Sequence, residues 1–119
     1  VHSADGLDEL SIADKTFIAE LKGGVVTTYS IHPKEFGFSL GNLNDIKADD
    51  AEGSLSLIKE AFSGQNGTAK DIISLNAGAA IYVSGLTTSL QSGVDRANQA
   101  LSNGSAQHKL EEYVKASNG

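Results

Sequence analysis

The chain of 119 residues contains no cysteine, no methionine and no tryptophan, and it has only one proline. The absence of cysteine excludes a disulfide framework, a thiol nucleophile and a thiolate zinc site, and it fits a cytoplasmic protein. No apolar run approaches the roughly 18 residues that a membrane-spanning helix needs. With 39% apolar and 6% aromatic residues, the chain predicts a modest core built from aliphatic side chains and alanine.

Positive charge is also scarce. Nine lysine and arginine residues stand against fifteen aspartate and glutamate residues, which gives a net charge of −6. No basic stripe is available to neutralise nucleic-acid phosphates, and no basic cluster is large enough to hold an anionic membrane surface. We therefore expect neither a nucleic-acid partner nor a membrane partner.

Acidic residues, in contrast, are concentrated near the start of the chain. Asp5, Asp8 and Glu9 surround Gly6 and follow a segment that we expect to be the end of a strand. Carboxylate oxygens are ligands that magnesium and calcium prefer, but the spacing alone also fits a solvated acidic turn. Adjacent residues on a regular strand point to opposite faces, so Asp8 and Glu9 can share one metal only if the backbone turns there or if one of them acts through water. Gly6 makes such a turn feasible.

The residues that follow predict a β-hairpin. β-branched and aromatic residues fill positions 16–21 and 25–31, and Gly23-Gly24 between them suits a tight turn with positive φ. Pro33 ends the second strand because proline cannot donate to a ladder. Positions 35–47 are expected to form an irregular connection that packs on the core through Phe36, Phe38, Leu40, Leu43 and Ile46.

Beyond residue 48 the apolar period is helical, and four helices are expected. The first begins with a capping box at Asp49 and Glu52 and can end at Gly64. The Asp49–Glu52 segment could also hold a cation, but capping explains it fully. The apolar face of this helix is expected to consist of Ala51, Leu55, Ile58 and Phe62.

The second helix, over residues 71–83, is apolar on nearly every face, which is typical of a helix buried on all sides. Thr68 is its expected cap, and its Ala-Gly-Ala-Ala run would let a neighbouring element approach closely. Asn76 within it is either a site residue or, as is commoner for buried polar groups, bonded to nearby backbone. One hairpin is too small to cover such a helix, so we expect it to pack against elements outside this chain.

The third helix is expected over 89–103 and the fourth over 106–115. Their predicted buried faces consist of Leu90, Val94, Ala97 and Leu101 in the third helix, and of Leu110, Tyr113 and Val114 in the fourth. The first residue is a valine, so the chain is expected to be the C-terminal piece of a larger α/β protein.

The segment from Asp5 to Glu9 resembles the Asp-Gly-Leu-Asp-Glu motif of the anthranilate phosphoribosyltransferase family. Other matches follow in the order and approximate spacing of that family's C-terminal third, and each is weak alone. Together they span nearly the whole chain: the hairpin with Ala19-Glu20-Leu21 and Gly24, the Pro33-x-x-Phe36-Gly37 turn, Asp71-Ile72-Ile73-x-Leu75-Asn76-Ala77, and Ser102-x-Gly104-x-Ala106.

The resemblance implies a homodimeric enzyme with a small helical domain and a large α/β domain of the phosphoribosyltransferase and nucleoside phosphorylase type. Residues 1–119 would be the C-terminal portion of the α/β domain, namely a β-hairpin followed by about four helices. The family transfers a phosphoribosyl group from phosphoribosyl pyrophosphate (PRPP) to anthranilate in tryptophan biosynthesis, with Mg²⁺ bound. Its metal-binding pair corresponds to Asp8 and Glu9, whereas Asp5 is not expected to be a direct ligand.

The family's glycine-rich Gly-Thr-Gly-Gly-Asp loop, its Lys-His-Gly-Asn-Arg-type segment and its anthranilate-binding arginine do not occur in this chain. The chain alone is therefore expected to be inactive. Two alternatives stay open. One is part of a pyrimidine nucleoside phosphorylase, against which the acidic motif argues. The other is a non-catalytic domain of the same fold that binds a partner through the apolar surface around residues 72–83.

Overall fold

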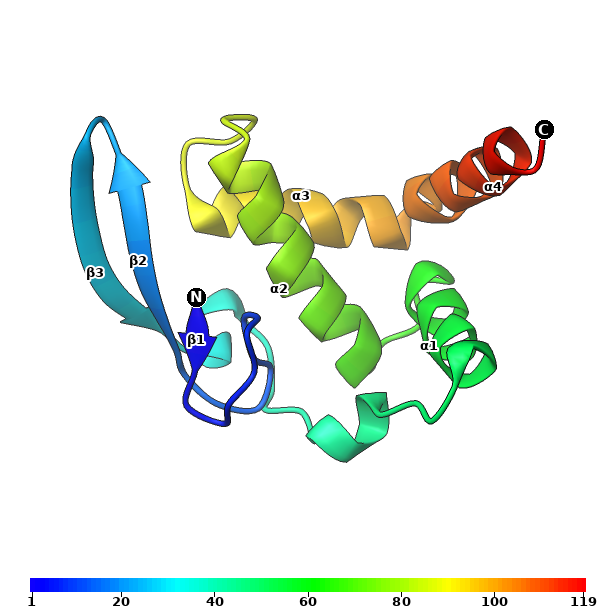
Figure 1. Cartoon of the computed structure of the whole chain (residues 1–119), viewed down its shortest axis with the longest axis horizontal. Coiled ribbons are helices and arrows are strands. Elements are labelled where there is room, and N and C mark those ends of the chain that lie inside the picture. The colour runs from blue at the N-terminus through cyan, green and yellow to red at the C-terminus, as the bar shows by residue number, and fades with distance from the viewer.

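The computed structural model describes all 119 residues as a three-stranded antiparallel sheet followed by helices (Figure 1). The predicted order of a strand end, a hairpin and four helices is confirmed. The elements are β1 (His2–Ser3), β2 (Thr16–Lys22), β3 (Val25–Ile31), the short 3₁₀ helices η1 (Pro33–Phe36) and η2 (Leu43–Ile46), and the helices α1 (Ala51–Phe62), α2 (Thr68–Val83), α3 (Leu90–Ser102) and α4 (Ser105–Ser117).

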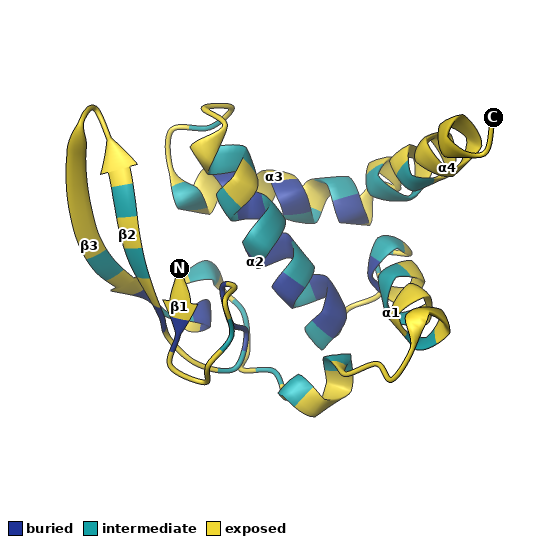
Figure 2. Ribbon diagram, viewed as in Figure 1, coloured by how far each residue is buried: buried dark blue, intermediate teal, exposed yellow.

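The predicted hairpin is confirmed in both its strands and its turn. Strand β2 pairs antiparallel with β3, and Gly23 and Gly24 adopt φ angles of 59° and 80° between them. Both values lie in the left-handed region, which glycine enters without steric cost. The strand ends next to β1 are buried, whereas the residues at the tip of the hairpin are exposed (Figures 1 and 2).

Helices α2 and α3 cross at two glycines, as the Ala-Gly-Ala-Ala run predicts. A methyl group on Gly78 would lie 2.5 Å from the Cα atom of Val94, and one on Gly93 would overlap the carbonyl oxygen of Gly78. The two backbones therefore touch at a point where no side chain fits. This crossing brings Val94 onto Leu75 in the core.

The core is small and lies where the sheet, α2 and α3 meet. Its buried apolar cluster consists of Leu10, Ile31, Leu75 and Val94, with Phe36 and Phe38 of the predicted connection among the residues packed against it. Only 18 of 119 residues are buried, and the dark segments of Figure 2 lie mainly along α2 and α3. No helix combines the length and the apolar character needed to cross a membrane.

The structure corrects two predicted helix caps. Helix α1 is capped by Asp50, whose carboxylate accepts from the backbone N–H of Gly53 at 2.7 Å, and not by Asp49. Helix α2 begins at Thr68, after Gly67, with no side-chain cap. Adjacent aspartates offer two equivalent starts, so the sequence pattern could not separate Asp49 from Asp50.

The predicted apolar faces of α1 and α4 are less buried than expected. Helix α4 buries no residue: Tyr113 and Val114 are 69% and 48% exposed, because no other element covers that face. In α1 the buried residue is Ala61, whereas Leu55 is 42% exposed, so the inner face is rotated from the predicted one. Val83 at the end of α2 is 75% exposed, so this helix is not enclosed within the chain, as the small size of the hairpin predicts.

Ser74 of α2 gives a stability prediction. Its hydroxyl is fully buried and has no hydrogen-bond partner, so folding removes it from water without compensation. We expect Ser74→Ala to raise the free energy of unfolding by about 0.5–1.5 kcal/mol, helped by the better helix propensity of alanine. Urea unfolding of both forms measures this. A loss of about 1 kcal/mol or more would contradict the assignment of an unpaired hydroxyl.

Candidate functional site

The acidic segment forms a turn between β1 and the buried residues that follow it. The backbone N–H of Ser3 donates to the carbonyl of Leu7 at 3.0 Å, and that of Gly6 donates to the carbonyl of Ser3 at 3.1 Å. Gly6 has a φ of 94°, a conformation that disfavours any other residue. The turn that the sequence predicts at Gly6 is therefore confirmed, and the chain is not a regular strand at Asp8 and Glu9.

Asp5 is engaged in closing this turn. Its two carboxylate oxygens accept hydrogen bonds from the hydroxyls of Ser3 and Ser11, and one of them also accepts from the backbone N–H of Leu7 at 3.4 Å. Partial burial acts to raise the pKa of Asp5, but the donors, Ser11 first, outweigh it and hold the pKa below its ordinary value. The Asp5 carboxylate thus stabilises the turn in its ionised form.

Asp8 and Glu9 lie on the exposed side of the same turn. Both side chains are exposed and neither forms an ion pair. Glu9 also borders a cleft of about 390 Å³, whose other walls include Leu7 and apolar residues of α1 and α2. The two carboxylates are therefore free to bind a cation from outside the chain.

The donor set of this pair fits magnesium held jointly with another ligand. No three His, Cys, Asp or Glu side chains of the chain stand close enough to enclose a metal. Magnesium in proteins is commonly held by one or two carboxylates, with waters and substrate phosphate oxygens completing its octahedron. Asp8 and Glu9 can supply the carboxylates, and the remaining positions suit phosphate oxygens and water.

Asn76 connects this segment to α2. Its side-chain oxygen accepts from the backbone N–H of Leu10 at 2.9 Å, and its NH₂ group donates to the carbonyl of Leu10 at 2.8 Å and to that of Ile72 at 3.0 Å. The expectation that Asn76 bonds to backbone is confirmed. The sequence did not indicate its partner, because Leu10 lies 66 residues away.

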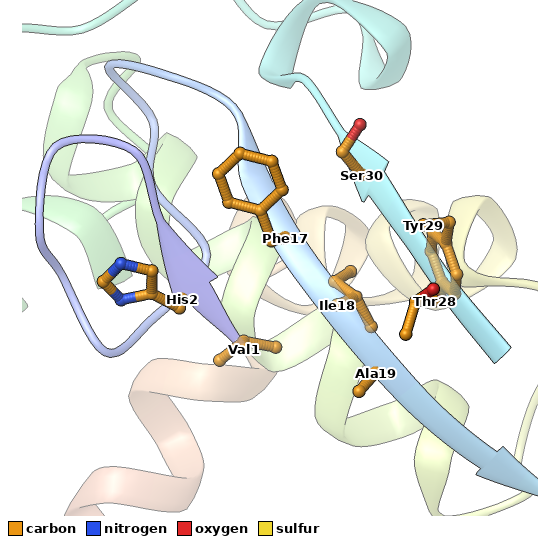
Figure 3. A pocket seen from close by; sticks show the side chains of 8 residues that line it. All are labelled: Val1, His2, Phe17, Ile18, Ala19, Thr28, Tyr29 and Ser30. Atoms are coloured by element: carbon orange, nitrogen blue, oxygen red, sulfur yellow. The ribbon is translucent and has the colours of Figure 1, made fainter. Parts of the chain in front are cut away.

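The other candidate residues lie elsewhere. His32 accepts a hydrogen bond at the start of η1, and the ring of His108 lies 3.2 Å from the carboxylate of Glu112 on the exposed surface of α4. A separate open hollow of about 580 Å³ lies on the sheet (Figure 3). No residue of the acidic turn lines it; its walls are Val1, His2, Phe17, Ile18, Ala19, Thr28, Tyr29 and Ser30.

A polar network that the sequence did not indicate joins the hairpin to α2. Glu20 accepts from the hydroxyl of Tyr82 at 2.6 Å and from that of Tyr29 at 3.0 Å, and Lys22 donates to Tyr82 at 3.1 Å. These hydrogen bonds, that of Tyr82 first, hold the pKa of Glu20 below its ordinary value. Burial and the bond to Glu20 raise the pKa of Tyr29 to about 12.

The lowered pKa of Glu20 predicts a pH-dependent contribution to stability. A carboxylate with a depressed folded-state pKa stabilises the fold fully above its unfolded-state pKa and loses this effect as the pH falls through the folded value. The difference in free energy of unfolding between the unmodified chain and Glu20→Gln should therefore shrink on acidification. Urea unfolding from about pH 7 down to pH 3 measures it, with the exposed Glu60→Gln as control. A difference that is constant with pH would contradict the network.

Comparisons with known proteins identify the family. The model of the glycosyl transferase family, a/b domain, matches residues 1–107. The anthranilate phosphoribosyltransferase of Ruthia magnifica is 58% identical over 117 residues, which are 98% of this chain and 34% of the relative. That of Vesicomyosocius okutanii is 55% identical over 119 residues, which are 100% of this chain and 35% of the relative. The chain thus spans about a third of the length of the curated relatives it matches.

Solved structures similar to this chain point to the same family. Anthranilate phosphoribosyltransferase from Thermus thermophilus superposes with a TM-score of 0.83 at 32% identity, over 94% of this chain and 33% of that one. The Saccharomyces cerevisiae enzyme in complex with PRPP and Mg superposes with a TM-score of 0.80 at 23% identity, over 96% of this chain and 33% of that one. At this identity the match shows a shared fold. The resemblance to anthranilate phosphoribosyltransferase and the α/β phosphoribosyltransferase-type fold class are both confirmed. The chain therefore belongs to the glycosyl transferase family, whose a/b-domain model matches residues 1–107.

Proposed function

We propose that this chain is the C-terminal portion of an anthranilate phosphoribosyltransferase, which transfers a phosphoribosyl group from PRPP to the amine of anthranilate and releases pyrophosphate. The observation that carries the proposal is the 58% identity with the Ruthia magnifica enzyme over 98% of the chain. The helical domain and the loops that grip PRPP and anthranilate belong to the other two thirds of such an enzyme. A homodimer and a cytoplasmic location are parts of the same proposal.

In this proposal Asp8 and Glu9 would hold Mg²⁺ beside the pyrophosphate of PRPP. Mg²⁺ bound there supplies electrostatic stabilisation of the negative charge that develops on the leaving group. The two carboxylates act as oxygen ligands and need not exchange a proton. Their exposure and freedom from ion pairs support this role, as does the yeast enzyme of the same fold, which was solved with PRPP and Mg.

A chimeric enzyme tests the proposal: this chain replaces the matching third of the Ruthia magnifica enzyme. PRPP-dependent consumption of anthranilate, followed by its fluorescence, should proceed at a rate comparable with that of the intact relative. The 119-residue chain alone should show none. A folded chimera that leaves anthranilate unchanged would refute the proposal, and turnover of thymidine with phosphate would favour the nucleoside phosphorylase alternative.

A further inference from the structure

The two residues that flank Asp8 and Glu9 are each fixed by a pair of hydrogen bonds. Before the pair, the backbone N–H of Leu7 donates to the hydroxyl of Ser3 at 2.8 Å, and the carbonyl of Leu7 accepts from the backbone N–H of Ser3 at 3.0 Å. After the pair, Leu10 is bonded through both its N–H and its carbonyl to Asn76. Only the two acidic residues lie between these anchored positions.

The Asn76 contact resembles the pairing of a residue in a β-ladder. An amide side chain offers one acceptor and two donors, so it can satisfy both backbone groups of Leu10 at once. Leu10 is only 1% exposed, and its backbone groups would otherwise be costly to bury. The third bond of the side chain, to the carbonyl of Ile72 in the preceding turn of α2, fixes the direction of the amide.

An apolar residue such as leucine at position 76 would favour the helical conformation more than asparagine does. Contact between apolar surfaces is non-directional, however, and would leave the backbone of residues 8–10 free to rotate. A double hydrogen bond fixes that backbone and hence the directions in which Asp8 and Glu9 leave it. Ligands whose geometry is set in advance bind a cation without the entropy loss of ordering at that moment.

We propose that Asn76 is a positioning residue for the Asp8–Glu9 pair. From its place on α2, Asn76 fixes the backbone of residues 8–10, so that both carboxylates face one metal-bound diphosphate. This inference rests on the proposed function for its catalytic meaning. The anchoring itself is a property of the fold and can be measured without activity.

The first arm of the experiment measures anchoring by hydrogen exchange in the chimera. Asn76→Leu keeps the size of the side chain but removes both bonds to Leu10, and exchange over residues 7–12 should become about tenfold faster. Ser74→Ala, in the same helix and without a bond to lose, is the matched control and should not accelerate exchange there. Should Asn76→Leu fail to fold, Asn76→Asp takes its place in the experiment, because it keeps the side-chain oxygen that accepts from Leu10 and removes only the NH₂ group that donates. Unchanged exchange in the folded variant overturns the proposal.

The second arm separates positioning from a merely structural role. In Asn76→Leu the KM for PRPP and the Mg²⁺ concentration for half-maximal rate should rise about tenfold, with the KM for anthranilate unchanged. In an enzyme that already carries Asp8→Asn and Glu9→Gln, Asn76→Leu should cause almost no further rise in the KM for PRPP or in the Mg²⁺ requirement, because the carboxylates that Asn76 positions are gone. A fall in kcat with every KM unchanged would overturn the positioning role.

The two arms also keep this proposal distinct from the proposed function. If the unsubstituted chimera transfers no phosphoribosyl group, the proposed function fails, and the hydrogen-exchange arm alone decides whether Asn76 sets the backbone of the acidic segment. If the chimera is active and both exchange and KM stay unchanged in Asn76→Leu, only the inference about Asn76 fails.

Discussion

The double substitution Asp8→Asn with Glu9→Gln should lower kcat/KM for PRPP in the chimeric enzyme by about 10²–10³-fold, the cost typical of losing charge stabilisation at a leaving group. Both changes keep the size of the side chain and remove only the negative charge. Neither residue forms an ion pair, so the fold should be unaffected. The measurement is initial rate against PRPP at several Mg²⁺ concentrations, with the unfolding midpoint as a check of folding.

The chain offers a matched control for this prediction. Asp49→Asn with Glu52→Gln removes the same two charges from another exposed acidic segment, which caps α1 through Asp50 and not through Asp49. Rates in this control should equal those of the unsubstituted chimera. Equal losses in both double variants would mean that overall charge, and not a metal site, controls the rate. An unchanged kcat/KM in the Asp8, Glu9 variant would remove these residues from the site.

Local patterns in the sequence predict the elements of this fold well. Gly23-Gly24 between two β-branched runs identifies the hairpin, because only a tight turn needs two consecutive positive φ angles. Helix α3 spans Leu90–Ser102, within one residue at each end of the predicted range 89–103. Gly6 correctly indicates the turn that frees Asp8 and Glu9 from strand geometry. In each case the cause lies within a few residues of its effect.

Contacts between distant residues escape such patterns. The bonds of Asn76 to Leu10 and of Tyr82 to Glu20 join positions 66 and 62 residues apart, and only the packing of α2 beside the sheet brings them together. The pattern of α4 predicts a buried face, but no other element of the chain covers that face, and Tyr113 stays exposed. The acidic pair Asp8–Glu9 is visible in the sequence, whereas the residues that hold its backbone in place are not.

The crossing of α2 and α3 supports both the fold and the acidic segment, so Gly93→Ala should have the largest effect on stability. The added methyl group would overlap the carbonyl of Gly78, a backbone atom that cannot move without displacing the helix. We expect the free energy of unfolding to fall by about 3 kcal/mol, the upper part of the range for overpacking. Urea unfolding measures this loss. Gly53→Ala in α1, where the new methyl group would meet the end of the Asp50 side chain at 3.3 Å, should change it by less than about 1 kcal/mol.

The same crossing links stability to the site, because Gly78 lies two residues after Asn76 on α2. If the methyl group on Gly93 forces the helices apart, α2 must move relative to the sheet, and the amide of Asn76 moves away from Leu10. Hydrogen exchange over residues 7–12 should therefore accelerate in folded Gly93→Ala even though this residue does not touch the acidic segment. Loss of stability without faster exchange there would show that α2 keeps its place and that α3 alone shifts. A free energy of unfolding unchanged by Gly93→Ala would contradict the close crossing of α2 and α3 itself.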